Sequence, residues 1–341
     1  MRDLFRAAVR PSRRILAVLL VVAGSGLLAA PRTTQAQPTA DQLLTDMGLS
    51  SDDKQHVLNG EFVTAEVGAV SDRDLAFSIA FLVKTTPDNL SKKVVAGELV
   101  TSDAQVKTFG VISAAGNPAD FAKLEISSQA AQTLASAQGG EALNLSTSEI
   151  AAFKAVPGGA RPAIQQQLQR MLLARYQAYR ASGLGGIAPY DRGGSSTDVA
   201  ADLRKAGEAA KGLQKYMPAF HAVLLGYPKA TLPGMRETFY WLKYDIQGKE
   251  TYVLTHILAA SDGPSRAIVQ RQYYASTGYN AEQAVAGFLP VQGGTVVVYA
   301  AHAFTDQVAG FGGSMKRSIG KRVMADQMKK IFDAGRAEFG K

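Results

Sequence analysis

Cysteine is absent from the 341 residues of this chain, and histidine occurs only four times, at His56, His221, His256 and His302. Without cysteine the chain can form no disulfide, thiol nucleophile, zinc ribbon or iron–sulfur cluster. No histidine stands two or four positions from another, so the chain contains no HExxH motif and no paired metal-ligand spacing. We therefore expect neither a metal site nor a cofactor.

A hydrophobic run long enough to span a membrane is also lacking. Residues 15–30 carry no charge, but sixteen residues that include two glycines are short for a span. They follow residues 1–14, which hold five arginines and one aspartate, and they precede the small-residue site at 34–36. This order is typical of a secretory signal peptide. We expect residues 1–36 to be cleaved and a soluble protein to be periplasmic or secreted, with the Sec and twin-arginine routes both open.

The charge of the chain is concentrated at its ends. Six of the 37 basic residues and one of the 29 acidic residues precede the expected cleavage point, which leaves +3 of the formal +8 on the mature chain. The last 27 residues hold eight Lys or Arg against three acids, and Phe332 and Phe339 are their only aromatic side chains. This pattern favours a solvated helix face, or peripheral contact with a membrane surface, over binding of nucleic acid.

Three segments of the mature chain differ in hydrophobic periodicity. Residues 37–117 predict a helical start, with Ser50 and Asp53 as an N-terminal cap, followed by strands over 61–67, 76–84 and 106–113. Residues 118–230 are rich in Ala, Gln and Gly and predict a helical insertion, most clearly a helix over 162–181. Residues 231–341 predict four strands, 238–246, 251–260, 266–276 and 295–304, and a long helix from Ser314 to about Phe339.

This element order predicts an α+β fold. The segments Phe239-Tyr240-Trp241, Thr255-His256, 272–276 and 310–314, in that order, resemble an uncharacterised family of exported bacterial proteins within the START and polyketide-cyclase-like superfamily. The specific part of the resemblance covers 232–330. It implies the helix-grip fold, in which a curved antiparallel sheet wraps around the C-terminal helix and leaves an apolar cavity.

The resemblance implies a fold and a cavity but no reaction. Thr277-Gly278 and Ala301 stand at positions where the family tends to carry polar or charged residues, so no catalytic role is transferred from the family to this chain.

Alternation along the expected strands selects the candidate ligand-binding residues. An apolar sheet face with a few polar groups is what a small-molecule cavity requires. One face of strand 266–276 carries Gln270, Gln272 and Tyr274 under strict alternation. The candidate residues for the whole sheet are Tyr240, Tyr244, His256, Tyr274 and His302.

Three functions remain open from the sequence. The leading hypothesis is an exported protein that binds an apolar or amphipathic, lipid-like molecule without a cofactor. The second is a cyclase- or hydrolase-like enzyme that uses His256 or His302 with Tyr274 and Asp245 in the same cavity. The third is a cell-envelope interaction protein, which requires a filled cavity and an exposed apolar patch on residues 118–225.

Overall fold

The computed structural model describes residues 38–246, 248–310 and 312–339. The expected signal peptide, residues 1–36, lies outside the described residues. Within the described part, no helix combines the length and the apolar character needed to cross a bilayer.

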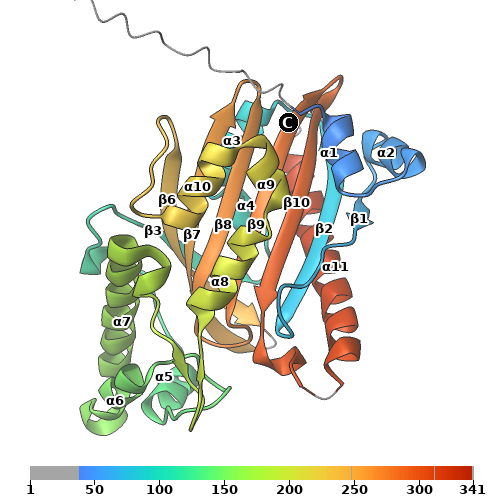
Figure 1. Ribbon diagram of the computed structural model, residues 1–341. Helices are drawn as coiled ribbons and strands as arrows, with labels where there is room; N and C mark the ends of the chain where they lie inside the picture. Colours follow the sequence, from blue (N-terminus) through green and yellow to red (C-terminus); the bar gives the residue numbers. More distant parts are fainter. Residues whose placement is uncertain (1–37, 247, 311, 340–341) are drawn as a thin grey trace, which may run out of the picture. The chain divides into compact units, whose positions relative to one another are not determined.

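An eight-stranded antiparallel sheet forms the centre of the described part of the chain (Figure 1). The strand order is β1-β2-β10-β9-β8-β7-β6-β3, so β6 to β10 form a continuous meander. The strands span β1 (Val63–Ala65), β2 (Asp74–Val83), β3 (Val106–Ile112), β6 (Arg236–Ile246), β7 (Lys249–Asp262), β8 (Ser265–Ala275), β9 (Ala281–Val291) and β10 (Gly294–Phe304). The α+β class and the long helix at the C-terminal end agree with the sequence prediction.

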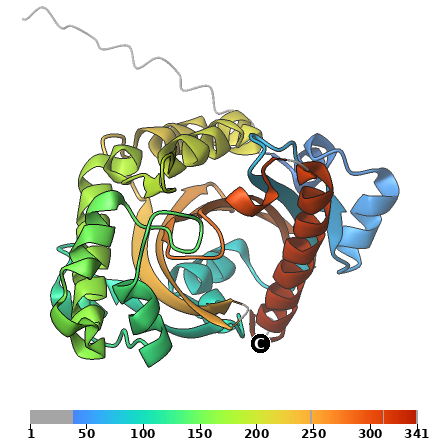
Figure 2. The same cartoon turned by 90° about the horizontal axis from the view of Figure 1, so that it is seen from below.

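Helices cover both faces of this sheet. Figure 2 shows the sheet as an arc, with α3, α4 and α11 on its inner, concave side and the insertion helices outside. The concave helices are α3 (Pro87–Val95), α4 (Glu98–Thr101) and α11 (Gly313–Phe339). The convex helices are α1 (Ala40–Asp46), α2 (Ser51–Leu58), α5 (Ser128–Ala135), α6 (Thr147–Lys154), α7 (Arg161–Ser182), α8 (Val199–Glu208), α9 (Lys211–Tyr216) and α10 (Pro218–Gly226).

Local sequence signals place several of these helices. The Ser50 side chain accepts the Asp53 N–H, and the Asp53 carboxylate accepts the Ser50 N–H, so the expected capping box starts α2. Pro87 occupies the first turn of α3, where its missing N–H costs nothing. The predicted helix over 162–181 is α7, one residue longer at each end.

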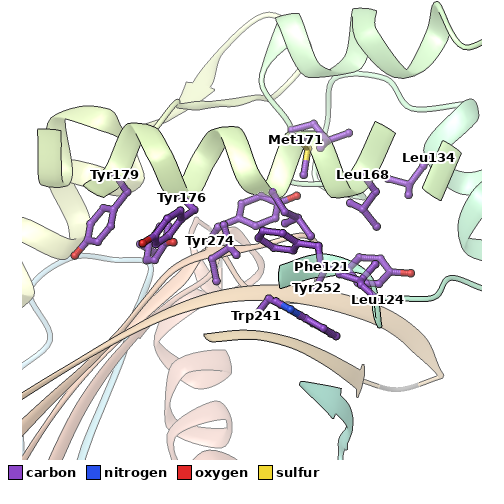
Figure 3. Packing of buried hydrophobic residues seen from close by; sticks show 14 of the residues in the cluster. Phe121, Leu124, Leu134, Leu168, Met171, Tyr176, Tyr179, Trp241, Tyr252 and Tyr274 are labelled. Carbon is purple, nitrogen blue, oxygen red and sulfur yellow. The ribbon is translucent and has the colours of Figure 1, made fainter. Parts of the chain in front are cut away.

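The largest core cluster lies between α7 and the convex face. Leu168, Met171, Tyr176 and Tyr179 of α7 point toward the strands that carry Trp241, Tyr252 and Tyr274 (Figure 3). The Trp241 indole donates to the Asp120 carbonyl at 2.7 Å, which satisfies the only polar atom of that side chain. The insertion therefore shares its core with the sheet.

The strand β9 was not predicted from the sequence. Its segment, Ala281–Val291, is rich in Ala and contains few β-branched residues, so local propensity gives a weak signal. The strand forms because β8 and β10 pair with it on both sides. Pro290 lies beyond the last residue that pairs with β8, Phe288, so its missing N–H breaks no bond of that ladder.

Arg271 joins the sheet to the convex helices. Its side chain is 1% exposed and donates to Gln283 Oε1 at 2.8 and 2.9 Å, to the Tyr179 hydroxyl at 3.2 Å and to the Leu224 carbonyl at 3.1 Å. One guanidinium thus connects β8 with β9, α7 and α10 through neutral acceptors.

We expect Arg271→Ala to lower the free energy of unfolding by about 3 kcal/mol, because three buried polar partners lose their donor. Urea denaturation measures this change. The control is Arg170→Ala on the exposed side of α7, with an expected change within about 0.5 kcal/mol. Equal losses in both variants would contradict the bridging role of Arg271.

Candidate functional site

A cavity of about 490 Å³ lies between the concave face and the helices α3, α4 and α11. It forms because α11 lies against only one side of the arc. A Cβ at Gly320 would lie 2.9 Å from Leu75 of β2, and the Phe332 ring centroid is 4.7 Å from that of Phe81. On the opposite side, the Tyr240 hydroxyl of β6 donates to the Val95 carbonyl of α3. The space between these two contacts is the cavity.

The wall of the cavity is mainly apolar. Leu242 and Ile257 contribute from the sheet, Leu99 from α4, and Met324 and Met328 from α11. Methionine side chains adapt easily to the shape of a ligand, so the α11 side of the wall can accommodate molecules of different outline.

A polar cluster occupies one part of this wall. Glu282 of β9 accepts from the Tyr299 hydroxyl at 3.5 Å, and the Tyr279 hydroxyl donates to the Gln272 side chain. Asp103, which follows α4, accepts the Gln105 N–H at 2.9 Å and the Gln327 side-chain amide of α11 at 3.5 Å. The cluster therefore collects side chains from β8, β9, β10, α11 and two connecting segments.

Burial shifts the titration of this cluster. Burial raises the pKa of Glu282 to about 7; the Asp103 charge acts in the same direction, and the hydrogen bond from Tyr299 opposes it. Burial also raises the pKa of Asp103 itself, against the hydrogen bonds that lower it. The pKa of Tyr244 is raised by burial and by both of these carboxylates. The cavity thus holds acidic groups that are only weakly solvated.

Of the five residues expected to bind a ligand, Tyr240 and Tyr244 line the cavity. His256, Tyr274 and His302 do not line it. In the antiparallel pair of β6 and β7, Tyr240 stands directly opposite Thr255, whereas His256 stands opposite Phe239. Because residues directly opposite share a face, His256 lies on the convex side.

A bulge in β8 corrects the expected alternation of that strand. Gln272 pairs with Thr255, but Tyr274 pairs with Leu254, so Tyr273 is an extra residue between them. The extra residue reverses the alternation. Gln272 therefore lines the cavity, while Tyr274 belongs to the core beneath α7.

His256 is a buried core residue. Its Nδ1 lies 3.1 Å from the Tyr179 hydroxyl, its Nε2 lies 3.3 Å from a Glu237 carboxylate oxygen, and its ring stacks on Phe239 at 4.1 Å. Burial lowers the pKa of His256 to about 4 in spite of Glu237. The ring is therefore neutral at physiological pH.

His302 lies on the convex side in a second pocket of about 360 Å³, next to Gln283. Its Nδ1 lies 2.8 Å from an oxygen of the buried Asp74. Asp245, the acid considered as a partner for either histidine, is exposed and accepts the Gly248 N–H in the turn after β6.

The large exposed hydrophobic side chains lie outside the insertion. Among the described residues they are Leu58, Val111, Met315, Ile319 and Val323. Three of these are on α11, and Val323 also lines the cavity. Within 118–225, no comparable apolar side chain is exposed among the residues that the structure describes.

Asp103, Tyr279, Glu282 and Tyr299 were not predicted from the sequence as candidate site residues, whereas Gln272 was placed on the expected cavity face of its strand. Glu282 lies on the missed strand, and Tyr299 was overlooked although its strand was predicted. A charged residue in an otherwise apolar stretch, as in Ala281–Val291, was the one available signal for Glu282.

No family model, curated protein or solved structure matches the chain. In the described part of the chain, no group of three or more His, Asp and Glu side chains is arranged to hold a metal ion.

We expect Glu282→Gln to stabilise the protein at high pH. The folded-state pKa of Glu282, about 7, lies above its ordinary value of 4.5, so the folded state binds more protons than the unfolded state between these two values. The stability that the folded state gains from tighter proton binding at Glu282 is fully present below about pH 4.5 and is lost as the pH rises through about 7. Glutamine carries no charge to desolvate and escapes this loss.

Thermal unfolding from pH 4.5 to 8.5 tests this expectation. The difference in Tm between the variant and the wild type should be small near pH 4.5 and should increase in favour of the variant up to about pH 8. Asp326→Asn, on the exposed side of α11, controls for the removal of one negative charge. A difference that is constant across the pH range would contradict the assignment to Glu282.

Proposed function

We propose that the protein binds an apolar or amphipathic small molecule in the cavity between the concave face and α11. The observation that carries this proposal is the cavity itself, because about 490 Å³ of mainly apolar space falls within the range of small-molecule sites. In this proposal residues 1–36 direct export, and the soluble mature protein meets its ligand in the periplasm or outside the cell.

The proposal includes the helix-grip arrangement of the START and polyketide-cyclase-like superfamily. Its support is the continuous antiparallel meander β6–β10, the curvature of the sheet and the position of α11 on the concave side (Figure 2). A cavity between sheet and terminal helix is the feature that this arrangement implies.

Binding is favoured over catalysis because of the composition of the wall. Among the described residues that line the cavity, none is a histidine, serine or lysine, and the Thr255 hydroxyl has no hydrogen-bonded base beside it. The histidines considered for catalysis lie on the convex side, where α7 covers His256. The polar groups of the cavity are suited to orienting a ligand.

We expect Leu99→Trp to weaken binding of the neutral apolar dye N-phenyl-1-naphthylamine at least about tenfold, because the indole occupies the cavity. Fluorescence titration measures the dissociation constant. Val111→Trp is the matched control, since Val111 is 56% exposed on β3 and outside the cavity wall. Ala303→Leu, a smaller addition on β10, gives an independent test where the tryptophan variant unfolds.

Equal dye affinity in the wild type and in both cavity variants would overturn the proposal. Native mass spectrometry with lipid extraction, on protein purified from its own source, identifies the bound molecule. A wild-type protein that neither carries an amphiphile nor binds the dye would also overturn it.

A further inference from the structure

The charged side chains in the cavity wall are all of one sign. Asp103 and Glu282 line the cavity, and no Lys, Arg or His does so among the described residues. Neither carboxylate forms a salt bridge in the described part of the chain; their hydrogen-bond donors, Gln105, Gln327 and Tyr299, are neutral. Lys107, outside the wall, acts on Asp103 only by lowering its pKa. The protein therefore places two acids at an apolar cavity whose described wall contains no cation.

The strand register leaves space beside Glu282. This residue stands between Gln272 of β8 and Ala303 of β10, and both neighbours line the cavity. The alanine provides only a methyl group. The contact with the Tyr299 hydroxyl, at 3.5 Å, is too long to be a strong hydrogen bond. The carboxylate thus retains acceptor capacity toward the cavity.

An unsatisfied hydroxyl lines the same cavity. The Thr255 side chain is 3% exposed, and its Oγ1 has no hydrogen-bond partner. A buried hydroxyl without a partner costs free energy of the order of 1–3 kcal/mol. A ligand that reaches the polar part of the wall can remove this cost.

The wall of the cavity also contains aromatic side chains. Tyr240, Tyr244, Tyr279 and Tyr299 all line the cavity. Tyrosine rings attract ammonium groups through the negative potential of the ring face, and this attraction increases when the site excludes water. Carboxylates and tyrosine rings both attract a cation, whereas the carboxylates repel an anionic head group.

The polar side chains of the cavity wall are poorly suited to binding a metal ion. The described residues contain no group of three or more His, Asp and Glu side chains placed to bind one. Calcium and magnesium ions require six or more oxygen ligands. Two separate carboxylates provide only a minority of these ligands. An organic cation needs fewer direct ligands and gains from the apolar wall.

We propose that the ligand is an amphiphile with a positively charged ammonium group at its polar end, with the ammonium group near Glu282 and Asp103 and the hydrocarbon part against α11. This inference rests on the proposed function and specifies its ligand class.

Three probes with one chain length test it: decylammonium and decyl sulfate, each below its critical micelle concentration, and decanol below its solubility limit. Isothermal titration calorimetry at pH 8 on the purified full chain gives the dissociation constants. We expect the ammonium probe to bind at least about tenfold more tightly than decanol, and decyl sulfate to bind most weakly.

Glu282→Gln preserves the shape of the side chain and removes the charge. We expect it to weaken binding of decylammonium about tenfold and to leave the affinity for decanol unchanged. Asp103→Asn should act in the same direction. Asp326→Asn, exposed on α11 and outside the cavity wall, is the control for net charge. Unchanged decanol binding shows that a variant is folded.

The pH dependence supplies a further readout. Affinity for the ammonium probe should rise between pH 5.5 and 8.5, because Glu282, with a pKa near 7, must be ionised to attract it. The charged and titratable groups that face Glu282 come from four places. They are Asp103 after α4, Tyr244 of β6, Tyr279 between β8 and β9, and Tyr299 of β10. From α11 the wall receives the neutral Gln327.

The outcomes separate the two proposals. Equal affinity for all three probes, or preference for decyl sulfate, would falsify the ammonium inference and leave the proposed cavity function standing. Absence of binding by any of the probes, together with no binding of the neutral dye, would overturn both.

Discussion

The pleat of the antiparallel meander determines which side chains meet. Helices bury both faces of the sheet, so each residue of β6 to β10 must point either into the core beneath the insertion or toward α11. A shift of one residue exchanges these two environments. The bulge at Tyr273 makes this exchange within β8: Gln272 faces the cavity and Tyr274 the convex core. The ligand wall and the insertion core are therefore consequences of one register.

The cavity exists because the concave face is larger than the area its helices cover. The helix α11 approaches β2 closely at Gly320, and α3 packs across β7, β8 and β9, so the cavity occupies the part of the concave face that these helices leave uncovered. The convex face is covered more fully, by eight helices from α1 to α10. Among the residues considered for catalysis, His256 is therefore packed beneath α7, whereas Asp103 and Glu282 line the cavity on the concave side.

Much of the fold could be predicted from sequence because its signals are local. Ser50 with Asp53, Pro87, and the apolar spacing of α7 each specify structure within a few residues. The strands rich in Tyr, Val and Ile were recognised for the same reason. The strand β9 was not, since its Ala-rich sequence becomes extended only through pairing with β8 and β10. Its loss from the prediction also removed Glu282, the residue with the most perturbed carboxylate of the cavity.

The sequence by itself determined the α+β class, the helices between the two groups of strands, the long terminal helix and the placement of Tyr240 and Tyr244 on one common face of β6. Composition and short-range periodicity carry these features. Only the tertiary structure decided that His256, Tyr274 and His302 lie away from the cavity and that Asp103 and Glu282 line it together. The physical reason is that strand alternation assigns residues to two faces but does not say which face is which. That choice depends on register, on one bulge and on which helices cover each side.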